Sequence, residues 1–477
     1  MSKVIVLGAG FAGHTAALYL RKRLAEIHEV HVISPQSYFQ FMPSLVWVGV
    51  GHMKPEETII DLMPVYRKQG IRFTIDRAVE IHVEKQAVVT ASGESYEYDY
   101  LINATGPYLN FEGTSGLGPK VGYTHSICTK EHAGQAAEAY LKAVQKMKAG
   151  ERQTIVAGTG HAGSTCQGAA FEYVQNIHYD LLHQGLRDMC DLVWFSNEAK
   201  LGDLGMGAFV FNVKGELRES EELTDWLMRD CNIRCMIGSR PIKIEQNKLF
   251  WENVRGEEGC LDYDFAMLIP QFIGQKIRYI NAEGEDISDK MSNPAGLMKV
   301  DADYESGPRG YANWKAEDWP SAYQSPLYPN IFAAGIAFAP PHPISAPSGI
   351  TASGVTIHAA PPRTGMIACI IGRMVADNIA DMIQNDDTII RRRIPMSKMP
   401  AACVASQRKS IATGSAIMVA LYPVVPDYTR YPVEHGGRNM KLTTYEIGKA
   451  SAWIKRILHH MFLYKMAAKP GWSYIPE

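Results

Sequence analysis

The stretch KVIVLGAGFAGHTAALYL (residues 3–20) joins an apolar strand, a glycine-rich turn and the start of an alanine-rich helix. Gly8, Gly10 and Gly13 match the G-x-G-x-x-G fingerprint. Its first glycine makes a tight turn, the second lets backbone approach a pyrophosphate, and the third lets the helix pack closely on the strand. The helix N-terminus offers N–H groups and dipole to phosphates, so a dinucleotide-binding domain is predicted. Ser34 ends the predicted second strand, where an acidic residue often binds the ribose, so we expect a weaker ribose contact there.

A second fingerprint, GTGHAG, occupies residues 158–163 and is followed three residues later by Cys166. We expect Cys166 to lie in the first turn of the following helix, whose dipole would lower the pKa of its thiol. Glu198, near the end of the next predicted strand, is a candidate ribose ligand for NADH. Two interpretations therefore stay open: a second nucleotide site, or a nucleotide-type turn that serves sulfur chemistry.

Composition and cysteine spacing limit the classes of function that are possible. The chain has 477 residues, enough for two or three domains, and its hydrophobic (46%) and charged (21%) contents are those of an ordinary globular protein. The net charge of -2 gives no indication of a nucleic-acid partner. The eight cysteines form neither C-x-x-C nor a zinc-type Cys/His cluster, so no metal is expected. No signal peptide and no apolar run of membrane-spanning length are recognised.

Two later segments indicate that the first nucleotide is FAD. YDYLINATGP (residues 98–107) and PNIFAAGI (residues 329–336) resemble segments of flavin disulfide-reductase-like proteins, except that Ile336 replaces an aspartate. An NAD-only Rossmann protein would not explain them. The resemblance implies an α/β fold with two Rossmann-like (three-layer β/β/α) nucleotide-binding domains and a C-terminal membrane-interface segment. The expected limits are 1–109 and 326–385 for the FAD-binding domain, 110–325 for the second Rossmann-like domain, and 386–477 for the C-terminal segment.

Three cysteine motifs occur in order along the chain. They are HSIC (residues 125–128) followed by His132, GSTCQGAAFE (163–172), and PAAC (400–403) after a predicted helix opened by PRTG (362–365). Together with YFQFMPSLVWVGVG (38–51), they resemble the sulfide:quinone oxidoreductase family, whose relatives include flavocytochrome c sulfide dehydrogenase and type II NADH dehydrogenases. The resemblance extends from residue 1 to about residue 466, and three cysteines in matching contexts make it specific.

The resemblance places Cys166 and Cys403 on either side of the flavin ring, joined by a disulfide or a chain of sulfurs. Sulfide would open this bridge by thiol–disulfide exchange. The persulfide on one cysteine would leave the other as a thiolate against flavin C4a, and two electrons would pass into the flavin. Repetition would lengthen the sulfur chain until polysulfide leaves.

Other residue roles also follow from the resemblance. Cys128 would assist sulfur transfer or bond to the flavin, or else be a free thiol near the cofactor. Glu172 and His132 are candidate proton acceptors near the flavin, although a solvated helix-face carboxylate would equally explain Glu172. The residues expected to bind FAD are Gly8, Gly10, Gly13, Ser34, Gly106, Gly335, Thr364 and Gly365.

The chain departs from the family pattern at three positions. Asp203, in the loop GDLGMG (residues 202–207), stands where many members carry a histidine. Arg363 stands where a lysine is common, and Leu458 where an aromatic residue usually contacts the quinone ring. The family's histidine role is therefore not expected here, and one side of the quinone would meet an aliphatic side chain.

Residues 438–469 contain seven Lys or Arg and one Glu. Their apolar residues recur near helical spacing, which predicts a basic amphipathic helix at a membrane interface. The apolar face comprises Ile447, Ala450, Ile454, Ile457, Leu458, Met461 and Tyr464, with the aromatic residues Trp453, Phe462, Trp472 and Tyr474 nearby. A helix packed on the protein's own core would show the same periodicity. By resemblance, Lys455 protonates or hydrogen-bonds the quinone and Leu458 contacts its ring. We expect a peripheral, monotopic membrane protein; its membrane face stays open, and a homo-oligomer is compatible with the resemblance.

Three functions are weighed. The leading hypothesis is an FAD enzyme that oxidises sulfide to polysulfide or elemental sulfur and reduces a membrane quinone, with sulfide, quinone and membrane lipid as partners and no nucleic acid. The intact second fingerprint and Glu198 keep a type II NADH:quinone oxidoreductase as an alternative. A flavin-bearing redox sensor or binding protein without turnover is the third, because the family histidine and aromatic residue are missing.

Overall fold

The computed structural model describes residues 1–213, 215–304, 313–362, 364–408 and 413–477. A five-stranded parallel sheet with the order β22-β9-β1-β2-β5 contains the N-terminal strand at its centre. Its strands are β1 (Lys3–Leu7), β2 (Glu29–Ser34), β5 (Arg72–Ile75), β9 (Tyr100–Asn103) and β22 (Ile331–Ala333). Val4 of β1 stands opposite Val30 of β2 and Tyr100 of β9. Because β22 pairs with β9, the chain returns to its first sheet after a long excursion.

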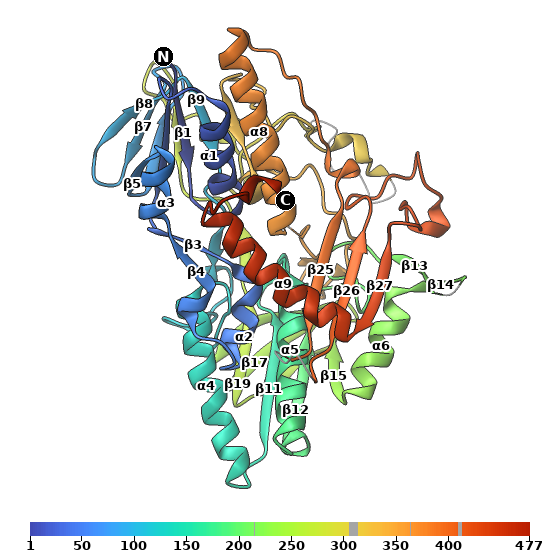
Figure 1. The fold of residues 1–477 in the computed structure, drawn as a ribbon. Helices are drawn as coiled ribbons and strands as arrows, with labels where there is room; N and C mark the ends of the chain where they lie inside the picture. Colours follow the sequence, from blue (N-terminus) through green and yellow to red (C-terminus); the bar gives the residue numbers. More distant parts are fainter. Residues whose placement is uncertain (214, 305–312, 363, 409–412) are drawn as a thin grey trace.

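Both faces of this sheet are covered. Helices α1 (Phe11–Arg23) and α8 (Gly365–Asn385) pack tightly on each other beside it (Figure 1). A four-stranded sheet, β21-β6-β7-β8, contributes Ile81 and Val88 to the core that contains Val4. Double coverage explains why β1 is a continuous apolar run rather than an alternating one. The strands of this sheet are β6 (Ala78–His82), β7 (Ala87–Thr90), β8 (Ser95–Glu97) and β21 (Arg278–Ile280).

A four-stranded parallel sheet with the order β15-β12-β11-β19 forms the second body. Helices α4 (Lys130–Lys148) and α5 (Gln167–His183) contact it, and the antiparallel sheet β16-β17-β18 shares a core with its strands. Its strands are β11 (Gln153–Thr159), β12 (Cys190–Phe195), β15 (Ile233–Met236) and β19 (Phe265–Ile269), and those of the smaller sheet are β16 (Ser239–Glu245), β17 (Lys248–Asn253) and β18 (Glu258–Asp262). Two such layered bodies confirm the predicted α/β fold class; the predicted domain limits stay a prediction.

The C-terminal segment forms an antiparallel sheet, β25-β26-β27, and an α-helix, α9 (Lys449–Met466), that packs on it (Figure 1). Its strands are β25 (Ala401–Ser406), β26 (Ala416–Leu421) and β27 (Thr444–Gly448). Among the described residues, α9 is the single α-helix after α8. Ile447, predicted on the helix face, lies in β27 instead. Across the described ranges, no helix is long and apolar enough to cross a bilayer.

The remaining elements are short. The helices are α2 (Leu45–Gly49), α3 (Leu62–Gln69), α6 (Ser220–Asp230) and α7 (Ser288–Met291). The two-stranded pairs are β3 (Tyr38–Gln40) with β4 (Ile59–Asp61), β10 (Tyr108–Asn110) with β20 (Gln271–Ile273), β13 (Val210–Val213) with β14 (Glu216–Glu219), and β23 (Gly349–Ile350) with β24 (Thr356–Ile357).

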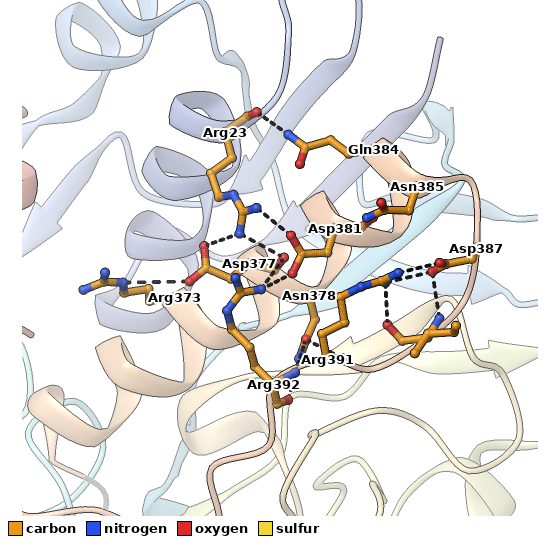
Figure 2. A network of polar contacts seen from close by, with 11 residues as sticks. Arg23, Arg373, Asp377, Asn378, Asp381, Gln384, Asn385, Asp387, Arg391 and Arg392 are labelled. Atoms are coloured by element: carbon orange, nitrogen blue, oxygen red, sulfur yellow. Dashed lines mark hydrogen bonds and ion pairs between the residues drawn. The ribbon is translucent and has the colours of Figure 1, made fainter.

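A network of ion pairs fastens the segment that leads to β25 onto the first body (Figure 2). Arg23, at the end of α1, pairs with Asp377 at 3.1 Å and with Asp381 of α8. Asp381 also pairs with Arg392, beyond the end of α8. Single exposed ion pairs contribute little to stability, but a network in which one carboxylate joins three segments contributes more. The network therefore fixes the course of the chain toward Cys403.

Candidate active site

The first fingerprint has the geometry of a phosphate-binding turn. A Cβ on Gly8 would lie 2.3 Å from the Ala104 carbonyl oxygen, and one on Gly13 would lie 2.0 Å from the Gly8 carbonyl oxygen. A Cβ on Gly10 would meet no atom within 4 Å. The first and third glycines are therefore required by close packing, whereas the second faces open space, as the approach of a pyrophosphate needs.

Two helix N-termini meet beside this turn. Helix α1 begins after Gly10, and α8 begins at Gly365, where a Cβ would lie 2.6 Å from the Phe11 ring. Neither helix has a side-chain cap or an acidic residue in its first turn. The buried Thr364 hydroxyl has no hydrogen-bond partner among the described residues. Uncapped N–H groups and an unpaired hydroxyl fit the phosphates of FAD.

The other residues predicted to bind FAD lie at the same edge of the sheet, because parallel strands present their carboxyl ends together. Ser34 is buried at the end of β2. Gly106 follows β9 and Gly335 follows β22, and both have a positive φ, at 69° and 68°. The assignment of these residues to FAD remains a proposal.

The second fingerprint folds differently. Helix α1 begins one residue after Gly10, whereas α5 begins seven residues after Gly160. Cys166 is therefore the N-cap of α5, with a left-handed φ of 62°, and not part of its first turn as predicted from sequence. The third glycine, Gly163, precedes the helix instead of packing it on the strand.

A distant segment causes this difference, since it bonds to the residues that would otherwise start the helix. The His358 N–H donates to the Ala162 carbonyl and the Ala360 N–H to the Ser164 carbonyl, both at 3.1 Å. The Asn197 side-chain amide donates to the same Ala162 carbonyl at 3.0 Å. The carbonyls of Ala162 and Ser164 are thus bonded to protein groups.

Glu198, the candidate NADH ribose ligand, also makes hydrogen bonds within the protein. Its carboxylate accepts hydrogen bonds from Trp194 Nε1 at 2.9 Å and from the Leu204 N–H at 3.1 Å. The side chain is fully buried, and this burial raises the pKa of its carboxyl to about 7. Glu198 therefore anchors the loop at residues 202–207 rather than facing a ribose.

Cys403 and Cys166 lie at the same end of α5. Cys403 is in β25, opposite Val419 of β26, and its Sγ lies 3.6 Å from the ideal Cβ position of Gly168, two residues after Cys166. Burial raises the pKa of the Cys403 thiol; the charge of Glu172 also raises it, and that of Lys455 lowers it. The two cysteines are 237 positions apart in the sequence, and the fold assembles them around one helix N-terminus.

Glu172 and Lys455 form a buried ion pair between α5 and α9. Lys455 Nζ donates to both carboxylate oxygens of Glu172, and also to the Val404 carbonyl at 3.0 Å. The Ser406 N–H donates to Glu172 at 3.0 Å. Burial raises the pKa of the Glu172 carboxyl, and the Lys455 charge opposes the rise. Glu172 is thus not a solvated helix-face carboxylate, and the pair links the strand of Cys403 to α9.

Three further members of this cluster were not predicted from sequence. Trp47 Nε1 donates to Ser406 Oγ at 2.8 Å, and the Asn176 amide donates to the Ser406 carbonyl at 2.6 Å. They come from α2, β25 and α5, and no local pattern marks them. Asn176 follows Glu172 by one helical turn, which is the one spacing signal available.

Cys128 and His132 lie around the start of α4. The Cys128 N–H donates to Ser126 Oγ, and burial raises the pKa of the Cys128 thiol to about 11. Burial lowers the pKa of His132, whose ring stands edge-on to Phe111 with centroids 5.6 Å apart. Among the described residues, no hydrogen bond joins Cys128 to His132.

Asp203 has a structural task. Its carboxylate accepts from Ser345 Oγ at 2.6 Å and from the Gly205 N–H at 2.9 Å, and burial raises its pKa. The positive charge of the fully buried Arg438 lowers the pKa of the Asp203 carboxyl and so opposes the effect of burial. Asp203 therefore holds the loop at residues 202–207 in shape. Arg363 lies outside the described residues.

Comparison with known proteins identifies relatives that are similar in sequence and in fold. Residues 2–185 match the model of the pyridine nucleotide-disulphide oxidoreductase family. The sulfide-quinone reductase of Aquifex aeolicus is 29% identical over 80% of this chain and 77% of its own. The crystal structure of the sulfide:quinone oxidoreductase from that bacterium matches 98% of this chain and 92% of its own, with a TM-score of 0.77 and 27% identity. The chain is thus similar in both sequence and fold to sulfide:quinone oxidoreductases.

NDH2 from Plasmodium falciparum, solved in complex with NADH, matches 97% of this chain with a TM-score of 0.63 and 13% identity, which is a likeness of fold. The alternative NAD(P)H-ubiquinone oxidoreductase B3 of Arabidopsis thaliana is 32% identical over 24% of this chain. The chain is a flavoprotein oxidoreductase with FAD as its cofactor.

Proposed function

We propose that the protein oxidises sulfide to polysulfide or elemental sulfur at Cys166 and Cys403 and passes the electrons through FAD to a quinone. One observation carries this proposal: Cys403 lies beside the first turn of α5, whose N-cap is Cys166, and the preceding turn is bonded through its carbonyls to protein groups. The resemblance to the sulfide-quinone reductase of Aquifex aeolicus supports it.

The two cysteines would work as a bridge. Hydrosulfide attacks the Cys403 sulfur, so a new S–S bond forms, the bridge S–S bond breaks, and Cys166 leaves as a thiolate. The persulfide on Cys403 gives its proton to Glu172, and its terminal sulfur bonds to the Cys166 sulfur with release of two electrons. Bound FAD supplies the electron transfer from sulfur to quinone. A second hydrosulfide then attacks the sulfur that is bonded to Cys166, which lengthens the chain on Cys403 and frees Cys166 as a thiolate. Attack of this thiolate on the Cys403 sulfur re-forms the original bridge and releases the chain as hydropolysulfide.

Glu172 and Lys455 supply the proton path of this proposal. The oxidation releases protons at the sulfur site, and reduction of a quinone consumes them. Glu172 is hydrogen-bonded to β25, which carries Cys403, and Lys455 comes from α9, which carries the residues predicted to contact the quinone. A direct carboxylate–ammonium contact lets a proton cross between the two sites without passing through solvent.

Anaerobic addition of sulfide to the FAD-loaded protein tests the function directly. We expect the absorbance of oxidised flavin to disappear and to return when a short-chain quinone is added. Steady turnover of both substrates would exclude a redox sensor that lacks catalysis. An unchanged flavin spectrum after sulfide would refute the proposal.

NADH is expected not to reduce the flavin. The second turn is bonded to residues 358–360 and to Asn197, and Glu198 is buried against Trp194. Anaerobic stopped-flow mixing with NADH should leave the flavin absorbance unchanged on the timescale in which sulfide bleaches it. Bleaching by NADH at a comparable rate would restore the type II NADH:quinone oxidoreductase alternative.

Helix α9 is the candidate membrane contact because it buries polar side chains and exposes apolar ones. Its buried side carries Ser451, Lys455 and His459, whereas Ile457, at 53% exposed, and Leu458, at 40% exposed, face outward. The other exposed apolar residues of the helix are Trp453, Met461 and Tyr464. A helix that packed on the protein's own core would bury its apolar side. The exposed apolar side of α9 therefore indicates contact with an apolar environment outside the protein. We propose a peripheral, monotopic association with a membrane.

Two aromatic residues predicted near the membrane serve the protein interior instead. Phe462 packs against Phe11 and Phe41, with centroids 5.5 Å apart in both cases. Trp472 stands edge-on to Tyr19 at 5.1 Å. These contacts tie the end of α9 and the following residues to α1.

Charged substitutions on the outer side of α9 should release the protein from lipid. The double variant Ile457→Glu/Met461→Glu is expected to lower partition onto anionic vesicles at least about tenfold, because two apolar contacts are lost and charges are added. Vesicle co-sedimentation measures this. Ile389→Glu, at a residue that is 60% exposed elsewhere, is the matched control and should leave partition unchanged. Equal partition of all three proteins would contradict the assignment.

A further inference from the structure

The proposed reaction takes up one proton more than the sulfur site releases. Hydrosulfide carries a single proton, and its oxidation to sulfane sulfur releases that proton together with two electrons. Reduction of a quinone to a quinol consumes two electrons and two protons. The ion pair of Glu172 and Lys455 accounts for the proton that comes from the sulfur site. The other proton has to enter from outside the protein, so the quinone side needs a second group that can hold and give up a proton.

A buried histidine lies on the inner side of α9, one helical turn after Lys455. His459 is 5% exposed, and residues four positions apart share one face of a helix. Its Nδ1 is hydrogen-bonded at 2.9 Å to Oγ of Ser44, the N-cap of α2. The His459 ring stands edge-on to Phe41, with centroids 5.6 Å apart, and its centroid lies 6.4 Å from that of Trp47. These contacts fix the orientation of the imidazole.

The surface of the protein is close to this ring. The next residue, His460, is exposed, and its ring stands edge-on to His459 with centroids 5.0 Å apart. The preceding residue, Leu458, is 40% exposed and is the residue predicted to contact the quinone ring. Histidine gains and loses a proton between about pH 5 and 8, so it can take a proton from the surface and pass it on. His459 therefore lies between a source of protons and the predicted quinone contact.

We propose that His459 delivers the second proton to the quinone and that Ser44 orients its ring for this transfer. The inference rests on the proposed function. As two electrons reach the quinone, His459 gives a proton to one quinone oxygen and Lys455 gives a proton to the other. Lys455 then regains a proton from Glu172, and His459 regains one from the surface. Two donors on one side of α9 thus supply the two protons of the quinol.

The charges around His459 come from two helices. Lys455 lies on α9 itself, and its partner Glu172 comes from α5. His460, also on α9, can take up a proton as well. The groups that pack on the ring from α2 and from the residues before it carry no charge: Ser44, Phe41 and Trp47. Because Glu172 and Lys455 are unchanged in every variant below, they cannot cause a difference in pH profile between those variants.

Reoxidation of the flavin isolates the quinone half of the reaction. The FAD-loaded protein is reduced photochemically, without sulfide, and mixed anaerobically with a short-chain quinone. His459→Gln should be reoxidised at least about tenfold more slowly, because the amide can keep a hydrogen bond to Ser44 but cannot deliver a proton. The wild-type rate should fall as pH rises from about 5 to 8, and the variant should lose this dependence. Reduction of the variant by sulfide should keep the wild-type rate.

Two further variants separate proton transfer from structure. Ser44→Ala frees the ring to turn, so reoxidation should slow, but its pH dependence should remain because the imidazole is still present. His460→Gln is the matched control on the same helix and should keep both the rate and the pH dependence. The solvent isotope effect on reoxidation is a second measurement. It should rise in His459→Gln, where entry of the proton becomes the slow step, whereas a displaced helix would slow the reaction without raising it.

The outcomes distinguish this inference from the function on which it rests. Slow reoxidation in His459→Gln, with a flat pH profile and a larger isotope effect, supports the assignment. An unchanged rate in this variant would overturn it and leave the function intact. A slower rate with the wild-type pH profile and isotope effect would also overturn it, because His459 would then only shape the site. A wild type whose flavin is neither reduced by sulfide nor reoxidised by quinone would overturn both.

Discussion

Cys403→Ser is expected to lower sulfide-dependent quinone reduction by about 10³-fold or more, and Cys166→Ser by a similar factor. Each change removes a sulfur that forms or breaks a bond in the proposed cycle, and a serine hydroxyl can neither accept sulfane sulfur nor form the bridge. The two losses should not add in the double variant, because the cysteines act as one unit. Initial rates with sulfide and a short-chain quinone measure the effect.

The control for this prediction is Cys260→Ser, which changes an exposed cysteine far along the sequence from both motifs. It should retain the wild-type rate. FAD content should be equal in all the proteins, because neither Cys166 nor Cys403 is among the residues that fit the FAD phosphates. Retention of more than about a tenth of the rate in Cys403→Ser would show that the chemistry does not pass through this sulfur.

Lys455→Met should cost about 3–5 kcal/mol of stability, the second large effect that we expect. The change leaves the Glu172 carboxylate buried without its counter-charge; in the wild type, both side chains are at most 7% exposed. The double variant Glu172→Gln/Lys455→Met should recover most of the loss, since it removes both charges. Chemical denaturation, followed by circular dichroism, measures the three free energies of unfolding.

The loss in Lys455→Met should also depend on pH. Burial raises the pKa of Glu172 above its unfolded value, so the folded state holds the proton more tightly. Stability is then greatest at low pH and falls as pH rises through the folded pKa, so the deficit grows from acid to neutral pH. Lys449→Met, at an exposed position of the same helix, is the control. Equal unfolding free energies for the single and double variants would refute the ion-pair account.

The double variant also separates stability from catalysis. Its fold should be restored, but its quinone reduction should remain slow, because no acid or base connects the sulfur site to α9. If the double variant had both restored stability and full activity, the role of the ion pair would be structural, and the pair would not belong to the proton path.

The first body of the fold was predictable because its signals are local. Gly8, Gly10 and Gly13 act within one strand–turn–helix unit, and β2 ends at Ser34, as predicted for the second strand. The course of the second turn was not predictable, because hydrogen bonds from His358 and Ala360 determine it. The same glycine pattern therefore starts a helix at once in one body and after a delay in the other.

The residues of the candidate site could be predicted from the sequence, but the contacts between them could not. Resemblance named Glu172 and Lys455 separately, but nothing in the sequence indicates that they form an ion pair 283 positions apart. Periodicity likewise predicted that α9 is amphipathic and could not tell which side faces the protein. That side is decided by Glu172, which needs a buried partner that Lys455 supplies.

Helix α9 is therefore fixed to the rest of the protein and is not a freely moving attachment. Its inner side is fastened by Lys455 to Glu172 and by the His459–Ser44 contact at 2.9 Å, and its end is fastened by His14 to the Met466 carbonyl at 2.7 Å. A surface that binds the outer side of such a helix holds the whole protein at one angle. The sulfur site and the FAD edge would then keep a constant height above that surface through every turnover.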